Sequence, residues 1–134
     1  MSDRAPAFFS PAELTRPAGY SHVVSIPAGR LVWTAGQVGV DADGTVASGW
    51  EGQTRLALAN VGHALGAAGA GWADVVKLTF FVVDVSALET IRAARDEVVD
   101  TVHPPTSSLV QVAGLVRGDL LIEVEAVAWL SDDG

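Results

Sequence analysis

The sequence contains no cysteine. This absence excludes a disulfide scaffold, a zinc site built on thiolates and a cysteine nucleophile. Basic residues are also scarce: eight Lys and Arg stand against sixteen Asp and Glu, which leaves a net charge of -8. Because a surface of that sign repels phosphate backbones and anionic lipids, we expect no general binding to nucleic acid or membranes.

Long apolar segments are missing as well. Apolar runs such as residues 80–83 are far shorter than the ~20 residues that span a bilayer. Residues 1–4 lack the apolar stretch of a signal peptide. Hydrophobic residues nevertheless make up 49% of the 134 positions, which suffices for one core and leaves no room for a second domain. We therefore expect a single acidic, cytoplasmic domain over residues 1–134.

Turn residues and hydrophobic periodicity divide this domain into elements in the order ββαβαββ. Residues 1–19 carry three prolines without sustained periodicity, and we interpret them as an irregular lead-in. The pattern predicts a hairpin of strands 21–26 and 31–38, later strands at 75–83, 108–115 and 120–130, and helices over 50–68 and from residue 88 onward. This order fits an α+β fold, with an antiparallel or mixed sheet and both helices on one face.

The second helix has a predicted start and stop. Ser86 and Glu89 have the spacing of a capping box, in which the two side chains bond each other's backbone N–H groups. Two prolines at positions 104 and 105 would end the helix. Its inward face is predicted to hold Leu88, Ile91, Val98 and Val102.

The last strand has two unlike faces. Its even-numbered positions from Leu120 to Leu130 are all apolar and suit a face that lies under the helices. The opposite face of the sheet mixes two glutamates with apolar residues, namely Phe81, Val83, Val127 and Trp129. Such a face is too apolar for water and too charged for a core, so we predict that it packs against another subunit. The alternative is a half-solvated sheet on a monomer.

Two stretches are candidates for chemistry. Gly36, inside a strand, marks a bulge or a close approach to the backbone, unless the strand simply ends there. Glu123 and Glu125 share a face at about 7 Å spacing, where carboxylates serve as general bases, orient a water or form ion pairs between subunits. The three histidines, at positions 22, 63 and 103, lack the spacing of metal ligands, so we expect no metal site.

The chain also carries a series of six segments whose order is informative. They are residues 19–22 (GYSH), 31–37 (LVWTAGQ), 53–60 (QTRLALAN), 75–79 (VVKLT), 105–112 (PTSSLVQV) and 122–126 (IEVEA). Together they resemble the RidA family, also called the YjgF or L-PSP family, over nearly everything from Tyr20 to Leu130.

The resemblance implies a homotrimer with a chorismate-mutase-like fold, in which three sheets form a central barrel and ligands bind in clefts between subunits. The family's best-known activity is the hydrolysis of reactive enamines and imines to 2-oxo acids and ammonia, without a metal or organic cofactor. In deaminating members an Arg holds the substrate carboxylate by two hydrogen bonds, while a Glu and a bound water assist proton transfer and attack.

Carried over residue by residue, the resemblance makes Glu123 the catalytic residue. It predicts six substrate contacts, from Tyr20, Ala35, Gly36, Arg92, Ser107 and Leu109. Ser107 stands where deaminating members have the carboxylate-binding Arg, Ala35 replaces the usual Ser, and Arg92 replaces a helix Asn. Arg92 either restores positive charge near the carboxylate or pairs with Glu89 or Asp96 on its own helix.

Two functions stay open, and the residues favour the first only slightly. One is a cofactor-free hydrolase or deaminase of small imines, enamines or related metabolites, with altered specificity and little activity on 2-aminoacrylate. The other is a trimeric metabolite-binding or chaperone-like protein without catalysis. A third, an endoribonuclease or translation inhibitor, is disfavoured because the charge of -8 leaves few basic side chains for phosphates.

Overall fold

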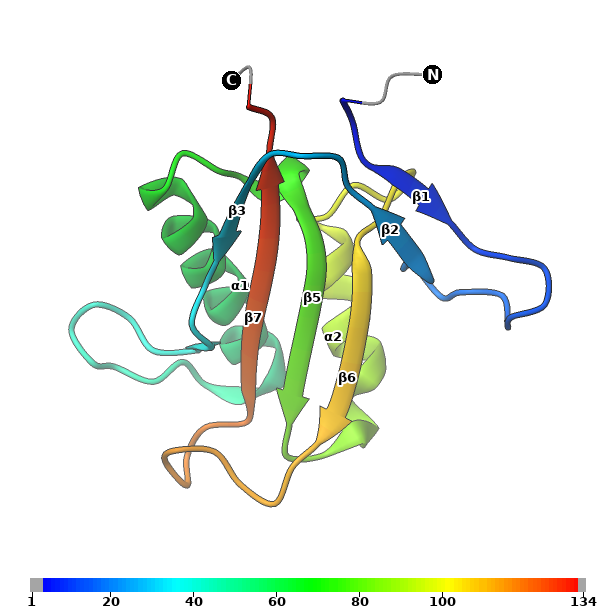
Figure 1. Ribbon diagram of the computed structural model, residues 1–134. Coiled ribbons are helices and arrows are strands. Elements are labelled where there is room, and N and C mark those ends of the chain that lie inside the picture. The colour runs from blue at the N-terminus through cyan, green and yellow to red at the C-terminus, as the bar shows by residue number, and fades with distance from the viewer. Residues whose placement is uncertain (1–3, 133–134) are drawn as a thin grey trace.

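The computed structural model describes residues 4–132. They form a main sheet with two helices on one face and a separate pair of short strands (Figure 1). The strands are β1 (Ala7–Phe9), β2 (Val23–Ser25), β3 (Arg30–Trp33), β4 (Gln37–Val38), β5 (Val75–Val82), β6 (Thr106–Gln111) and β7 (Ile122–Leu130). The helices are α1 (Gly49–Ala67) and α2 (Leu88–Asp96), with short 3-10 turns at Trp72–Asp74 and Val85–Ala87.

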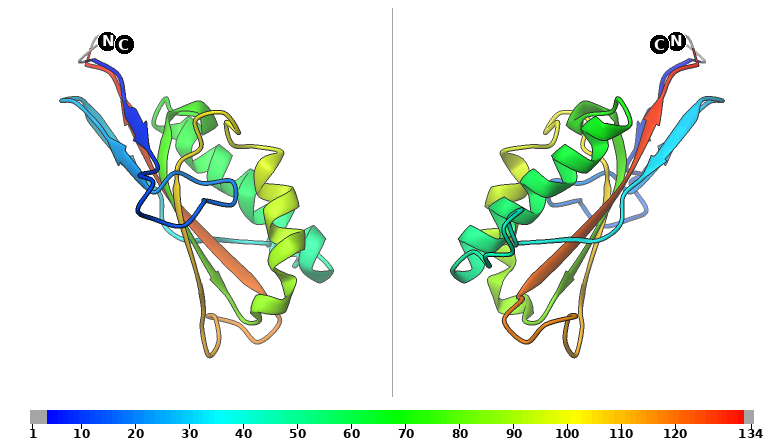
Figure 2. Two further views of the ribbon diagram at one scale, coloured as in Figure 1. Left: turned by 90° about the vertical axis from the view of Figure 1, so that its right-hand side faces the viewer. Right: turned by 90° about the vertical axis from the view of Figure 1, so that its left-hand side faces the viewer.

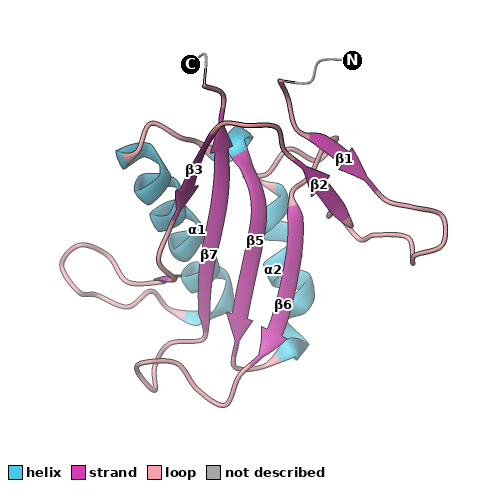
Figure 3. Cartoon of the chain, in the orientation of Figure 1, coloured by secondary structure: helices cyan, strands magenta, loops and turns pink. Residues whose placement is uncertain are grey.

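The main sheet is mixed, which is one of the two arrangements predicted. Its strand order is β3-β7-β5-β6, and β4 also pairs with β7 (Figure 3). The strands β3, β4 and β5 run antiparallel to β7, whereas β5 and β6 are parallel. A parallel pair needs a crossover connection, and α2 supplies it between β5 and β6.

The core lies between the sheet and the helices, which cover the same face (Figure 2). The even-numbered residues of β7 from Ile122 to Ala128 are at most 2% exposed, which confirms the apolar face predicted for this strand. Leu58, Val61 and Leu65 of α1 are likewise buried at helical spacing. Gly69, at φ +81°, follows the helix in the left-handed conformation that commonly ends helices.

The predicted first hairpin is wrong. Strand β2 pairs with β1, in the segment interpreted as an irregular lead-in, and not with β3. The turn after β2 instead carries the chain from the small sheet to the edge of the main one. Turn residues between two apolar runs cannot specify which partners the strands choose, because pairing is decided by tertiary contacts.

The helix α2 begins at Leu88, as predicted, but the predicted capping box of Ser86 and Glu89 is not formed. The side chain that caps this region is that of Asp84, whose Oδ1 accepts the Ser86 N–H at 2.9 Å, while Glu89 binds Arg92 instead of the backbone. The hydrogen bond from the Ser86 N–H lowers the pKa of Asp84.

The end of α2 comes earlier than the prolines suggest. The helix stops at Asp96, so Val102, expected to face inward, is 77% exposed. Asp100 accepts the N–H groups of Val102 and His103, and these bonds, that of His103 first, lower the pKa of its carboxyl. An Asp turn has replaced the last helical turn.

Two side-chain amides of α1 form hydrogen bonds with the backbone of neighbouring segments. Asn60 donates from Nδ2 to the carbonyls of Val38 and Val40. Gln53, 3% exposed, donates to the Asp119 carbonyl and accepts the Leu121 N–H. The segment 53–60 therefore serves structure, since it holds the ends of β4 and β7 in register.

The face of the sheet away from the helices is open. Leu31, Trp33 and Val110 on this face are 44%, 71% and 44% exposed. Trp129, predicted to belong to this exposed face, is only 8% exposed, because the turn before β3 covers it and its Nε1 donates to the Pro27 carbonyl. Among residues 4–132, none of the helices is long and apolar enough to cross a membrane.

Candidate functional site

The predicted site residues fall into two groups on opposite faces of the sheet. Gly36 and Glu123 form the first group, on the open face. A side chain on Gly36 would collide with the Glu123 carboxylate, because a Cβ there would overlap Oε2. The close approach that the glycine predicted is therefore made by Glu123 itself.

A bulge produces this contact. The Thr34 N–H donates to the Ala126 carbonyl, and Thr34 Oγ1 accepts the Ala126 N–H. Further along, Gln37 lies opposite Val124. Three steps along one strand thus match two along the other, and the extra residue lets the backbone at Ala35 and Gly36 arch. Ala35 itself is exposed, and its carbonyl accepts from the Gln37 side chain.

The Glu123 carboxylate is half-buried and has neither a hydrogen bond nor an ion pair with any residue in the described part of the chain. Glu125, two positions on, is equally unpaired within residues 4–132. The nearby cation on this face, Lys77, donates to Ser108 Oγ at 2.7 Å, and desolvation lowers its pKa. A carboxylate without a partner is available to accept a proton.

The second group lines a hollow of about 270 Å³ between α2 and β6. Its walls come from four predicted site residues, Tyr20, Arg92, Ser107 and Leu109, together with Phe80, Leu88, Ile91 and Arg95. Ser107 and Leu109 face the helices because they lie opposite Leu78 and Phe80 of β5, which are buried there. Strand β6 forms the edge of the sheet, so this hollow lies at its rim.

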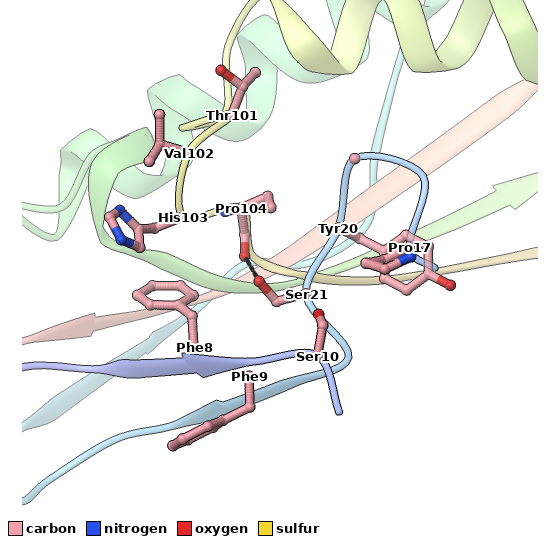
Figure 4. A pocket seen from close by; sticks show the side chains of 11 residues that line it. Phe8, Phe9, Ser10, Pro17, Tyr20, Ser21, Thr101, Val102, His103 and Pro104 are labelled. Atoms are coloured by element: carbon pink, nitrogen blue, oxygen red, sulfur yellow. Dashed lines mark hydrogen bonds between the residues drawn. The ribbon is translucent and has the colours of Figure 1, made fainter. Parts of the chain in front are cut away.

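Tyr20 lies in the hollow because its neighbour, Ser21, is hydrogen-bonded to the loop that precedes β6. Ser21 donates from Oγ to the Pro104 carbonyl at 2.6 Å (Figure 4), and its N–H donates to the Pro105 carbonyl. The segment 19–22 thus docks on the loop before β6. Tyr20 also lines a neighbouring hollow of about 370 Å³, where Phe8 and His103 lie with ring centroids 5.5 Å apart.

Two arginines of α2 face the hollow at β6. The pairing with Glu89 that was considered for Arg92 is formed, with Nη1 at 3.1 Å from the carboxylate. The same side chain lines the hollow. Arg95 was not among the predicted site residues. It stands where the period of Leu88 and Ile91 places a buried residue, and this position was the signal in the sequence.

The two groups cannot meet within one chain. Glu123 is on the open face, whereas Ser107 points toward the helices on the other side of the sheet. As to metals, the described residues include no cluster of three or more His, Asp and Glu side chains that could hold an ion.

Comparison with known proteins identifies the family. The family model described as Endoribonuclease L-PSP matches residues 11–130. The chain belongs to this family, which also goes by the names RidA and YjgF. The 2-iminobutanoate/2-iminopropanoate deaminase of Salmonella typhimurium is 36% identical over 131 residues, which cover 95% of this chain and 93% of that protein.

Solved structures agree on the fold. The Rid-family protein YyfB from Yersinia pestis superposes with a TM-score of 0.82 at 36% identity, covering 93% of this chain and 98% of its own. TdcF from Escherichia coli, crystallised with bound serine, superposes with a TM-score of 0.69 at 32% identity. The match covers 98% of this chain and 97% of TdcF. The predicted α+β fold of this family is confirmed.

The contact between Gly36 and Glu123 leads to a structural prediction. In a Gly36→Ala variant the new methyl group should push the flexible carboxylate of Glu123 aside, while the fold stays intact because Gly36 does not require a positive φ. A crystal structure and a melting curve of the variant test both statements. A Glu123 carboxylate that keeps its place beside the methyl group would contradict the prediction.

Proposed function

We propose that this protein is a cofactor-free hydrolase of imines or enamines, acting in clefts between the subunits of a homotrimer. The proposal rests mainly on one observation: the carboxylate of Glu123, unpaired within residues 4–132, and the hollow beside Ser107 lie on opposite faces of one sheet. We take each of them as half of a site. The related deaminase from Salmonella typhimurium supports the choice of reaction.

Assembly would complete the site. The open face exposes Leu31, Trp33 and Val110, which gives it an apolar surface for a neighbouring subunit. If the open face of one subunit meets the β6 edge of the next, Glu123 of the first comes to the hollow of the second. Burial of this face would also exclude water from the apolar side chains on it.

The chemistry needs only Glu123 and water. Water adds across the C=N bond of the imine, the resulting amino alcohol loses ammonia, and a 2-oxo acid remains. Glu123 would accept a proton from the attacking water and return it to the departing nitrogen. For an enamine, the same carboxyl group would first transfer a proton to carbon. No redox step occurs, so no electron carrier is required.

Specificity should differ from that of deaminases with an Arg at the position of Ser107. A serine offers one neutral donor, whereas guanidinium offers a charged fork of two. Hydrogen bonds to charged groups contribute about 1.5–3 kcal/mol each, so a small substrate held only by its carboxylate would bind weakly at Ser107.

The assembly is tested by mass. We expect light scattering to give about three times the chain mass of 13.8 kDa. Trp33→Glu, which places a charge on the open face, should shift the protein toward monomer. Ala59→Glu, on the exposed side of α1, is the matched control and should stay trimeric. A wild-type protein that elutes as a monomer at all concentrations would refute the trimer.

The reaction is tested on imines generated by an amino-acid oxidase, with ammonia release as the measurement. Glu123→Gln keeps the shape of the side chain but removes the base, so we expect the rate to fall by about 10²–10⁴-fold. If the variant changes only ligand affinity and wild type releases no ammonia above background, the protein is a binding protein instead of an enzyme.

A last comparison concerns 2-aminoacrylate, which is too small to fill the apolar part of the hollow. Wild-type protein should clear it at least about tenfold more slowly than a relative that carries the Arg, because one charged hydrogen bond is worth that factor. The two proteins are to be assayed side by side. Equal rates would show that the strand Arg is dispensable.

A further inference from the structure

We propose that α2 supplies the anion-binding group of this site, with Arg92 and Arg95 together holding the carboxylate of a ligand that has a bulky apolar body. The proposal deepens the proposed function, on which it rests for the identity of the site. It assigns to the helix the role that Ser107, on the strand, cannot perform.

The charge of the hollow is the first argument. The whole chain has eight Lys and Arg against sixteen Asp and Glu, yet two arginines and no carboxylate line this hollow. Its other walls are apolar, except for the hydroxyl groups of Tyr20 and Ser107. Glu89 and Asp96 pair with these two arginines from outside the lining, so among the described residues the lining itself presents cations and no carboxylate to a ligand, which suits an anion.

Arg95 is held in place. Its side chain is 8% exposed, its Nε donates to Asp96 at 3.0 Å and its Nη2 donates to the Ala18 carbonyl at 3.1 Å. Its Nη1 has no hydrogen bond to any residue between 4 and 132 and remains for a ligand. Gly19, at φ +80°, leaves the room that this guanidinium occupies, since a Cβ there would collide with Nη2.

Arg92 is easier to recruit. It forms an ion pair with Glu89, whose side chain is 86% exposed. Exposed pairs of this kind contribute little, so a ligand carboxylate can replace Glu89 at small cost. Arg92 and Arg95 are three positions apart and thus project from neighbouring turns of the same helix face. One guanidinium is fixed and the other is free to close on the ligand.

The remaining walls indicate the body of the ligand. Leu88 and Leu109 offer apolar surface above the buried Phe80 and Ile91, and the volume of about 270 Å³ suits a small molecule. Branched or aromatic 2-imino acids and the corresponding 2-oxo acids combine one carboxylate with an apolar side chain. They match both parts of the lining better than a three-carbon substrate does.

The test measures binding at equilibrium and needs no turnover. The probes are 4-methyl-2-oxopentanoate and its neutral primary amide, titrated by calorimetry into the wild-type protein. We expect the carboxylate to bind at least tenfold more tightly than the amide, and Arg92→Gln to reduce this ratio about tenfold. Pyruvate should bind more weakly than the six-carbon acid, because it leaves the apolar walls uncovered.

Matched variants separate recognition from structure. Arg55→Gln removes an exposed arginine on α1, outside the hollow, and should leave the ratio unchanged. Arg95→Gln should also lower the ratio. Arg95 ties the helix to Ala18, so the binding ratio of this variant is used only if its melting curve shows a folded protein. If it does not fold, the Arg92→Gln variant alone tests the proposal. A role of Arg95 in stability alone would lower the melting temperature and leave the ratio intact.

The outcomes distinguish this proposal from the proposed function. Suppose that wild type and Glu123→Gln both bind the carboxylate more tightly than the amide, that Arg92→Gln loses this preference, and that no imine is hydrolysed. The anion site is then supported and the hydrolase function is refuted. If imines are hydrolysed but the ratio is the same in wild type and Arg92→Gln, the hydrolase stands and the anion site is refuted. A wild-type protein that binds acid and amide equally also refutes it.

Discussion

The alternation of side chains along β7 is the constraint on which the rest of the structure depends. The strand lies between β3 and β5, and its even-numbered residues are buried under the helices. Burying them stabilises the fold by about 25 cal/mol for each Å² removed from water. Because the period of a strand is two, the same burial places Glu123 on the opposite face. A shift of one residue would bury two carboxylates, so the position of Glu123 is as firmly specified as the core.

The sequence predicts those parts of the fold whose pattern is local and long. The helix α1, the strand β5 and the two faces of β7 are in this class, since each repeats its period over several turns or pleats. The failures lie where partners are distant in the chain. The pairing of β2 with β1 and the early end of α2 at Asp96 depend on tertiary contacts and on one aspartate turn. Neither leaves a periodic trace.

The candidate site divides in the same way. The short distance between Gly36 and Glu123 could be anticipated, because a glycine inside a strand signals a close neighbour. The grouping of Tyr20, Arg92, Ser107 and Leu109 came from family resemblance, since these residues are far apart in sequence. The sequence does not predict Arg95 as a site residue, because arginine is almost never buried without a partner. Its partners, Asp96 and the Ala18 carbonyl, become visible only once the loop before β2 is folded against the helix.

A cation on α2 would act differently from a cation on the edge strand β6. A strand side chain has a fixed direction, so an arginine at the position of Ser107 would hold a carboxylate at one distance from the water-activating group. On α2, Arg95 is fixed by its hydrogen bonds, but Arg92 keeps an exposed and replaceable partner. Such a pair can follow ligands of different length along the apolar wall. Because an error of about 1 Å in placing the reacting atoms can cost 10²-fold in rate, this tolerance in binding would be offset by slower turnover of small substrates. In the proposed site, a long apolar side chain would restore the position by filling the hollow, which would couple the size of the substrate to the rate of the reaction.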